Sequence, residues 1–447
     1  MGIPYYFSHI LQSYPNIFFE YSRKRVKMDE LYIDSNSIIY EMVHKYGIEN
    51  WDLLFEKIYE KIVELVKLFG VNEVYIGFDG EPPYAKMEQQ RQRRYKNWLF
   101  REIKEDYKDT SFISPGTEFM NGLDDYLFEK IKEKGWIYSG SREKGEAEHK
   151  IFEIIRKKNE KGKRKLVYGL DADLIMLCLI HNEMNMYIYR ESPILNSEKL
   201  GIKFDEEKTY IIDITLFKTK LCEGKRDGYI MDYILICFFL GNDFLPHFPA
   251  YNIRTGGIFK LLENYEKLGE NITKNERINW KILKKYVEIL SKNEKENILE
   301  EYKKREKSEK IVKQKENNIE ELPIMERTKE IFINPSNNGW EDRYYWILFD
   351  ECESKKRINQ ICNEYYQTLE WCFDYYTKGC KDWKWKYRYH YPPLLKDLSL
   401  LLEYKKTELN VKDVKLLDYI MPNNYKDNYE VEWSFCKYLW ESHIILP

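Results

Sequence analysis

The chain has 447 residues, of which 43% are hydrophobic and 33% are charged, and its formal net charge is -3 at pH 7. This length exceeds what one simple core holds, so we expect two or three structural units. Because the charges nearly balance, a polyanion can bind only at a local basic patch and not through the field of the whole molecule.

The spacing of the cysteines and histidines bears on two kinds of structural cross-link, the disulfide bond and the bound zinc ion. The 8 cysteines include no C-x-x-C pair, and the 7 histidines show no zinc-binding spacing. This argues against a disulfide framework and against structural zinc, and it favours a reducing compartment.

The N-terminus MGIPYYF lacks a secretory apolar region, and the longest apolar run, 233–240, is far short of the about 20 residues that span a bilayer. We therefore expect no membrane association, and we expect that run to be a buried helix.

Residues 1 to about 260 alternate short apolar runs with longer amphipathic segments, which is typical of an α/β fold with a central, mostly parallel sheet. The expected strands are 31–33, 74–78, 136–138, 166–170 and 186–189. Three of these runs are followed by an acid, namely Asp34, Asp79 and Asp171. Because the carboxyl ends of parallel strands meet at one edge of a sheet, we expect these side chains to converge.

The stretch FDGEPPYAKMEQQRQRR, at 78–94, places a carboxylate beside a cluster of cations. After Asp79 a Gly-Glu-Pro-Pro turn leads into a helix on which Lys86, Gln90, Arg93 and Arg94 fall within about 100° of arc. The prolines place Lys86 in the first helical turn, where the free N–H groups also favour an anion. This face can bind a phosphate; the alternative is an ordinary solvated basic helix.

The second half of the chain changes composition twice. Residues 261–340 are rich in Lys, Glu and Asn and indicate a charged helical connector. Residues 341–447 contain the aromatic runs WEDRYYWILF, YYQTLEWCFDYY and WKWKYRYHYPP. We expect this region to form a helical, aromatic-rich unit packed against the first 260 residues.

Seven acids form the candidate catalytic set. They lie at the strand ends or in nearby apolar contexts: Asp34, Asp79, Glu146, Glu148, Asp171, Asp173 and Asp243. Burying so many like charges requires counter-ions. Two Mg²⁺ ions meet this need, since Mg²⁺ prefers oxygen ligands and a pair about 4 Å apart supports phosphodiester hydrolysis. The alternative for each acid alone is a turn or helix-capping residue.

Local spacing sets conditions on three of these positions. Asp171 and Asp173 face the same side if the strand continues through them. Glu146 and Glu148 reach one site only if a helix starts between them or just after them. Asp243 follows the buried helix, where Gly241 is a plausible C-cap. The nearby His149 and His247 are expected to support the site by hydrogen bonding rather than to bind metal.

The sequence blocks that contain these residues resemble those of the Xrn-type 5′-to-3′ exoribonucleases, a branch of the PIN-like, flap-nuclease superfamily. The matching blocks occur in the family's order: MGIPYYF, LYIDSNSII, FDGEPPYAKMEQQRQRR, SPGTEFM, GEAEHKI, YGLDADLIML, GNDFLPHFP and LEWCFDYYTKGCKDWKWKYRYHYPP. The resemblance implies that 1–260 is a PIN-like, Rossmann-like nuclease core, that the seven acids bind two metal ions, and that Lys86, Gln90, Arg93 and Arg94 hold a 5′-monophosphate. It further implies that a base is sandwiched between the side chain at position 40 and a late tryptophan, Trp383 or Trp385.

The implied activity is processive degradation of 5′-monophosphorylated single-stranded RNA to 5′-mononucleotides, with Mg²⁺ as cofactor and Mn²⁺ as a substitute. An upstream decapping enzyme is an implied partner, and no obligate protein partner is expected. The alternatives are a structure-specific 5′ flap or DNA nuclease and an inactive RNA 5′-end binding protein. A cytoplasmic location is expected; the basic run RKKNEKGKRK at 156–165 leaves a nuclear location as the alternative.

Two departures from the family pattern stand out. Tyr40 occupies the position where the family usually has a histidine, so stacking on a base remains possible but an imidazolium contact to phosphate does not. The sequence also contains no counterpart of the long C-terminal β-barrel modules of the large cytoplasmic members. Any function of those modules is therefore expected to be absent or supplied by a partner.

Overall fold

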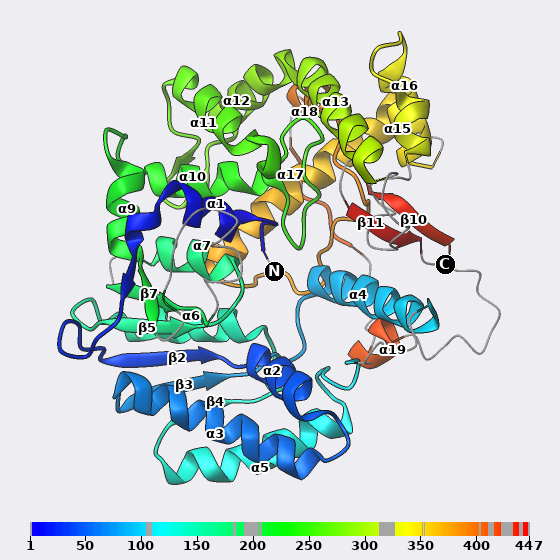
Figure 1. Ribbon diagram of the computed structural model, residues 1–447. Coiled ribbons are helices and arrows are strands. Elements are labelled where there is room, and N and C mark those ends of the chain that lie inside the picture. The colour runs from blue at the N-terminus through cyan, green and yellow to red at the C-terminus, as the bar shows by residue number, and fades with distance from the viewer. Residues whose placement is uncertain are drawn as a thin grey trace.

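The computed structural model describes residues 2–103, 110–181, 185–191, 205, 208–312, 327–350, 352, 354–401, 404–409, 415–421, 432–437 and 441–445, with side chains described except at 96, 98–103 and 432–445. Its centre is a seven-stranded sheet in the order β1-β7-β6-β5-β2-β3-β4 (Figure 1). The strands are β1 (Phe18–Glu20), β2 (Glu30–Asp34), β3 (Glu73–Gly77), β4 (Ile137–Ser139), β5 (Lys165–Tyr168), β6 (Met186–Tyr189) and β7 (Tyr210–Asp213).

The five strands from β6 to β4 are parallel, and only the β1 and β7 edge is antiparallel. Every residue of β2 is buried, as expected for a central strand covered on both faces. In the register of β2 with β3, Asp34 lies opposite Gly77, so Asp79 follows just beyond the same edge. The mostly parallel sheet and its converging strand ends confirm the expected fold.

Helices cover both faces of the sheet, as Figure 1 shows. One face carries α2 (Asn36–Tyr46), α3 (Trp51–Phe69) and α5 (Glu118–Glu133), whose apolar sides form one buried cluster with the strands. The opposite face carries α1 (Tyr6–Ser13), α6 (Ala147–Lys158), α7 (Asp173–Ile180), α9 (Ile214–Cys222) and α10 (Tyr229–Cys237). The expected buried helix is confirmed as α10 together with the 3-10 turn η4 (Phe238–Leu240), whose residues are all buried.

The second half of the chain packs on that opposite face and extends the same core. Its elements are η5 (Ile253–Thr255), α11 (Gly257–Leu268), β8 (Thr273–Lys274), β9 (Arg277–Ile278), α12 (Trp280–Lys292), α13 (Glu294–Val312), α15 (Thr328–Ile333), α16 (Trp340–Leu348), α17 (Lys355–Lys378) and α18 (Leu395–Leu400). The long helix α17 contacts α7 and buries most of its aromatic side chains. The aromatic-rich region therefore forms part of the surroundings of the sheet edge, as expected.

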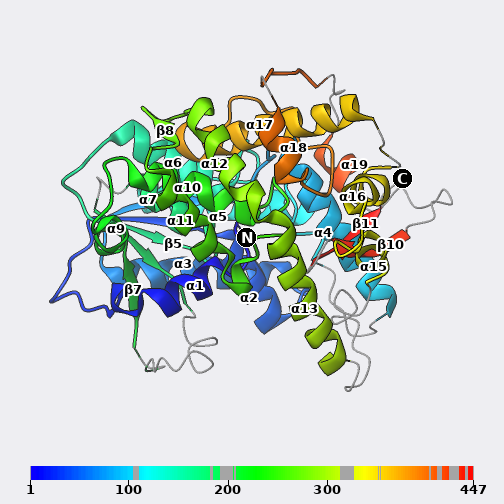
Figure 2. The ribbon, with the colours of Figure 1, turned by 90° about the horizontal axis from the view of Figure 1, so that it is seen from above.

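The basic helix α4 (Tyr84–Ile103) stands apart from the sheet and is flanked by late elements (Figure 2). It contacts α19 (Leu416–Ile420) and strand β11 (Glu441–Ile445), which pairs with β10 (Glu432–Lys437). Lys386 links these parts, since its Nζ lies 2.7 Å from Glu88 of α4 and donates to the hydroxyl of Tyr419 of α19 at 3.1 Å. The late region thus supports the helix that carries the candidate phosphate-binding cations.

Two segments differ locally from the expected structure. The strand expected at 166–170 ends at Tyr168, and the chain then turns into α7. Part of the expected charged connector, 261–340, is packed rather than solvated, because α12 buries Leu283, Tyr286 and Leu290. Among the described helices, none combines the length and apolar character that crossing a bilayer requires.

Candidate active site

Asp79 is held in one orientation by its neighbours at the sheet edge. The side chain of Asn36, at the start of α2, donates to Oδ2 of Asp79 at 2.7 Å and accepts from its backbone N–H at 2.9 Å. The backbone N–H of Ala147, at the start of α6, donates to Oδ1 at 2.8 Å. Asp34, the last residue of β2, is 7% exposed and lines the same cavity. The strand-end acids Asp34 and Asp79 therefore converge as expected.

Glu146 and Glu148 reach the site because α6 begins between them. Glu146 is the N-cap residue and Glu148 lies in the first turn, as the sequence required. Donor atoms of Glu146, Glu148 and His149 all lie within 4.8 Å of one another. The buried Nδ1 of His149 makes no hydrogen bond among the described residues, so the expected hydrogen-bonding role of this histidine stays a prediction. Its ring instead stacks on Tyr375 at a centroid distance of 3.6 Å.

Asp171 and Asp173 are brought to the site differently from the expected strand geometry. The strand does not continue through them, because β5 ends at Tyr168 and Asp173 is the first residue of α7. Asp171 lines the cavity from the connecting loop. Asp173 is 6% exposed and packs against the N-terminal segment, since a Cβ added at Gly2 would lie 2.9 Å from its backbone nitrogen. Burial raises the pKa of Asp173 to about 6.

Lys86 and Asp243 form an ion pair inside the acidic cluster. Nζ of Lys86 lies 2.7 Å from Oδ2 of Asp243 and 2.5 Å from Oε2 of Glu146. Burial alone would raise the pKa of Asp243, but the Lys86 ammonium holds that pKa well below its usual range. Lys86 therefore neutralises two of the acids, a role that its position on the basic helix face did not indicate. Asp243 follows Gly241, whose φ of 82° at the end of η4 confirms the expected C-cap.

The remaining acids repel one another. Burial and the neighbouring charge of Asp79 raise the pKa of Asp34, while burial and Glu146 raise the pKa values of Asp79 and Glu148. Carboxylates in this state are stabilised by bound cations, and their hard oxygen donors suit divalent ions. The residues present therefore fit a divalent metal centre.

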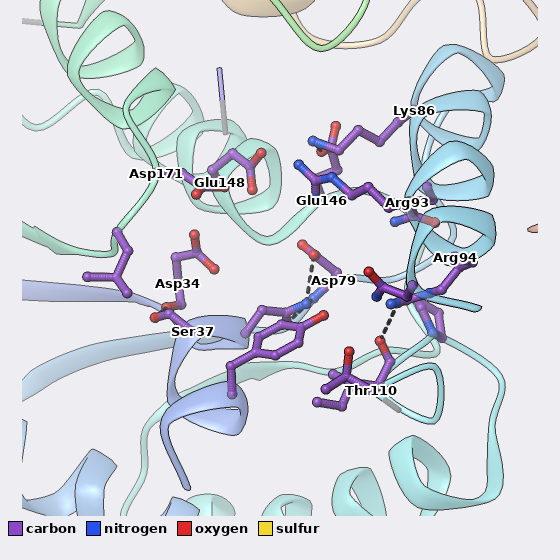
Figure 3. Close-up of a pocket in the computed structure, with 17 residues that line it drawn as sticks. Asp34, Ser37, Asp79, Lys86, Arg93, Arg94, Thr110, Glu146, Glu148 and Asp171 are labelled. Atoms are coloured by element: carbon purple, nitrogen blue, oxygen red, sulfur yellow. Dashed lines mark hydrogen bonds and ion pairs between the residues drawn. The ribbon is translucent and has the colours of Figure 1, made fainter. Parts of the chain in front are cut away.

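A cavity of about 360 Å³ joins the acids to the basic helix. Figure 3 shows Asp171 and Glu148 on one side of it and Lys86, Arg93 and Arg94, from α4, on the other. The cavity is lined by Asp34, Asn36, Ser37, Tyr40, Asp79, Lys86, Gln90, Arg93, Arg94, Asn97, Thr110, Ile113, Pro115, Glu146, Glu148, Leu170 and Asp171. All four residues of the expected phosphate-binding face are therefore in it, together with five of the seven acids.

The two arginines of α4 that line the cavity differ in their hydrogen bonds. Arg94 is 8% exposed, and its Nη2 donates to the carbonyl of Ile113 at 3.0 Å and to the hydroxyl of Ser114 at 2.8 Å. Arg93 presents buried Nε and Nη2 atoms that make no hydrogen bond among the described residues, and the same is true of Oε1 of Gln90. Buried donors without partners are costly unless a ligand accepts from them, so Arg93 is the cation best placed to bind an anion.

The aromatic candidates separate into exposed and buried side chains. Tyr40 lines the cavity and is 41% exposed. Trp385 is 1% exposed, and its Nε1 donates to the hydroxyl of Thr368, so it belongs to the core. Trp383 is 38% exposed and lies near Lys144, whose Nζ is 6.0 Å from the ring centroid. Of the two tryptophans, only Trp383 offers an open ring.

Sequence reasoning missed two supporting residues, Asn36 and Tyr375. Asn36 stands two residues after Asp34 in the IDSNS block, and that closeness was the available signal. The hydroxyl of Tyr375 donates to Oε1 of Glu146 at 2.7 Å from the far end of α17. Nothing local in the sequence distinguishes Tyr375 from the other tyrosines of that helix.

Known proteins place the chain in a family. The model of the XRN 5′-3′ exonuclease N-terminus matches residues 1–192, and that of the Xrn1 helical domain matches residues 225–338 and 333–422. Human 5′-3′ exoribonuclease 1 is 27% identical over 89% of this chain and 29% of its own length. The Drosophila melanogaster 5′-3′ exoribonuclease 2 homolog is 24% identical over 89% of this chain and 61% of its own length.

The chain thus spans less than two thirds of these relatives. Among solved structures, the catalytic core of Rad2 in complex with DNA aligns with a TM-score of 0.41 and 13% identity, over 89% of this chain and 92% of that one. The two family models follow each other along the chain and together take in every strand of the sheet except β7, as well as α4, the acids and α17. The chain belongs to the XRN family of 5′-3′ exonucleases.

Proposed function

We propose that this chain is a processive 5′-to-3′ exoribonuclease that degrades single-stranded RNA with a 5′-monophosphate to 5′-mononucleotides. One observation carries the proposal: the same cavity is lined by carboxylates on one side and by the cations of α4 on the other. The names of the relatives, which are 5′-3′ exoribonucleases, support the choice of RNA and of direction.

The α4 side of the cavity is proposed to bind the terminal phosphate. Arg93 has buried donors to offer, Arg94 is fixed by Ile113 and Ser114, and Gln90 adds a polar group. Guanidinium groups suit phosphate because they donate paired, charge-assisted hydrogen bonds. A cavity of about 360 Å³ leaves little room for a cap or triphosphate once a nucleotide is bound. This side therefore selects RNA with a 5′-monophosphate.

The acidic side is proposed to hold two Mg²⁺ ions, for which Mn²⁺ can substitute. When bound, such ions supply an activated water and neutralise the leaving oxygen. The chain's own part is to fix the carboxylates: Asn36 and the Ala147 N–H orient Asp79, and Tyr375 orients Glu146. Lys86 keeps Asp243 and Glu146 paired with a positive charge.

The distance between the two sides is proposed to act as a ruler. The turn from Gly80 to Pro83 joins Asp79 to α4, so the bound 5′ end sets which phosphodiester reaches the acids. Tyr40, with Trp383 as its partner, stacks on the terminal base. After each cut the shortened strand carries a new 5′-monophosphate, and the cycle repeats, which makes degradation processive.

Capped or triphosphorylated RNA must first be converted to the monophosphate, so a decapping reaction would supply the substrate. This function fits the cytoplasm, which we propose as the location, with the nucleus as the alternative.

The test of the proposed function is decay of an internally labelled RNA with a 5′-monophosphate in Mg²⁺, with product lengths resolved. Mononucleotides without intermediates support the proposal. Equal decay of 5′-triphosphate or 5′-hydroxyl RNA, or cleavage only of branched DNA, contradicts it.

A further inference from the structure

An unusual tyrosine, Tyr5, precedes α1 as its N-cap residue. Tyr5 has φ of 62°, a conformation rarely adopted by bulky residues, and is 49% exposed. The guanidinium of Arg254, in η5, lies 3.4 Å from the centroid of its ring. One face of the ring is thus covered by a cation, and the exposure that remains belongs to the rest of the ring.

A second exposed aromatic ring lies next to this pair. Phe259 of α11 is 60% exposed, and its ring packs edge-on against His9 at 5.3 Å. His9 lies one turn along α1 from Tyr5, and Phe259 follows Arg254 across the turn at Gly256. Two ring contacts therefore join α1 to the η5–α11 segment. Burial lowers the pKa of His9 to about 4, so the positive charge here comes from Arg254.

The location of this surface is fixed by the N-terminal segment. Gly2 packs directly on Asp173, and the three Cα–Cα steps from Gly2 to Tyr5 can span at most about 11 Å. Asp173 begins α7, and the adjacent Asp171 lines the cavity on the side opposite Arg93 and Arg94 of α4 (Figure 3). In Figure 1 the N-terminus lies between α1 and α4, so Tyr5, which precedes α1, and its neighbour Arg254 lie on the side of the acids away from the proposed 5′-phosphate site.

We infer that Tyr5, Arg254 and Phe259 form a platform for single-stranded RNA on the 3′ side of the bond that is cut. This inference rests on the proposed function, because a strand whose 5′ end is bound at α4 must leave across the acids toward α7. Bases stack on exposed aromatic faces whatever their identity, and an arginine adds attraction to the backbone phosphates. The platform would hold the strand between successive cuts.

The test is equilibrium binding of fluorescent single-stranded RNA in a chelating buffer, with strands of three and twelve nucleotides. The variants are Tyr5→Asn, Arg254→Gln and Phe259→Ala. Asparagine tolerates a positive φ better than tyrosine does, so Tyr5→Asn removes the ring without straining the turn. We expect the twelve-nucleotide strand to bind each variant about tenfold more weakly and the three-nucleotide strand to bind as it does to the unchanged protein.

Phe128→Ala is the matched control. Phe128 is 50% exposed with Nζ of Lys132 at 5.8 Å from its ring, but it lies on α5 on the other face of the sheet. Removing the Phe128 ring should leave the affinities for both the three-nucleotide and the twelve-nucleotide strand unchanged. Equal affinity of the Tyr5→Asn variant and the unchanged protein for the long strand, or an equal loss for both lengths, would overturn the platform.

Repeating the series with 5′-hydroxyl RNA separates this inference from the proposed function. A long-strand loss that persists without the phosphate supports the platform even if the unchanged protein shows no preference for a 5′-monophosphate. That missing preference would count against the proposed function alone.

Discussion

Tyr375 and Glu146 are joined by a hydrogen bond of 2.7 Å although 229 residues separate them. The tyrosine ring is stacked between His149, at 3.6 Å, and Trp371, at 4.8 Å, which leaves the hydroxyl no freedom to turn away. The other oxygen of Glu146 is bound to Lys86. A carboxylate of the acidic cluster is thus oriented by α17, which belongs to the aromatic region.

Replacing Tyr375 by phenylalanine should lower kcat by about tenfold or more, because a hydrogen bond to a charged group contributes about 1.5 to 3 kcal/mol. KM for RNA should stay unchanged, since the cations of α4 are untouched. Steady-state kinetics on a short 5′-monophosphate RNA would measure both. Tyr366→Phe is the control, as that hydroxyl donates from the same helix to the carbonyl of Leu398 at 3.1 Å. A similar loss in both variants would mean that Tyr375 acts only through stability.

Changing Asp171 or Asp173 to asparagine should abolish hydrolysis while leaving RNA binding intact. Each substitution removes a negative charge from the acidic cluster but none of the cations, so we expect activity to fall by about two orders of magnitude or more. Single-turnover cleavage and fluorescence binding would measure the two effects. Asp125→Asn is the control, because that carboxylate is 69% exposed and pairs with Arg142 away from the site. Full activity of the Asp171 variant would remove it from the catalytic set.

Arg93→Gln should remove most of the preference for a 5′-monophosphate, because the buried Nε and Nη2 of Arg93 make no hydrogen bond among the described residues. We expect the ratio of rates on 5′-monophosphate and 5′-hydroxyl RNA to fall by about tenfold or more. Arg91→Gln, on the same helix, is the matched control, since Arg91 packs over Tyr95 and Tyr419 at 5.4 and 5.0 Å. An unchanged ratio in the Arg93 variant would contradict the phosphate site.

Lengthening the turn between Asp79 and α4 by one glycine, placed between Glu81 and Pro82, should reduce cleavage more than it reduces stability. The turn is tied to the residue before Glu146, because Gly80 N–H donates to the carbonyl of Gly145 at 2.9 Å and Gly145 N–H to that of Glu81 at 2.8 Å. Cleavage rate, phosphate preference and Tm would be compared with those of a one-glycine insertion at Gly135, whose added Cβ would meet nothing within 4 Å. An unchanged cleavage rate and an unchanged preference for a 5′-monophosphate would contradict the proposal that this turn sets the distance between the two sides of the cavity.

The stability of the protein should fall between pH 5 and pH 8 through Glu294. This residue begins α13 and accepts the backbone N–H groups of Leu395 and Lys396 at 2.7 and 3.1 Å, and burial raises its pKa to about 8. The folded state keeps a proton that the unfolded chain releases above its own lower pKa. The free energy of unfolding therefore decreases as pH rises, by up to about 1.4 kcal/mol per unit.

The Glu294→Gln variant has no carboxyl group at this position and so does not titrate there. Denaturant unfolding at each pH should therefore show a shallower decline for the variant than for the unchanged protein across this range. Parallel declines in the two proteins would show that Glu294 does not titrate there.

How much the sequence predicted depended on how local the cause was. Asp34 and Asp79 follow from strand ends in a parallel sheet, and Glu146 and Glu148 from the start of one helix, so both pairs were predictable. Asp171 and Asp173 were predicted as acids of the site, but the strand proposed to align them ends at Tyr168.

Partners distant in sequence were not predictable. The pairing of Lys86 with Asp243 depends on how α4 stands against the loop after η4, and the bond from Tyr375 depends on the packing of α17 on α7. Periodicity fixes which face of a helix is apolar. It does not fix which of several tyrosines on α17 will meet a carboxylate.

The late arrival of α17 has a consequence for synthesis. The chain is made from its N-terminus, so the acids up to Asp243 exist before Tyr375 has been added. Until then Glu146 lacks its hydroxyl partner, and α7 and α10 expose apolar surface that the aromatic region later covers. A ribosome-bound chain shorter than about 380 residues therefore holds an unfinished site. Under the proposed function, a growing chain would therefore cut RNA slowly until Tyr375 has been added and α17 has packed.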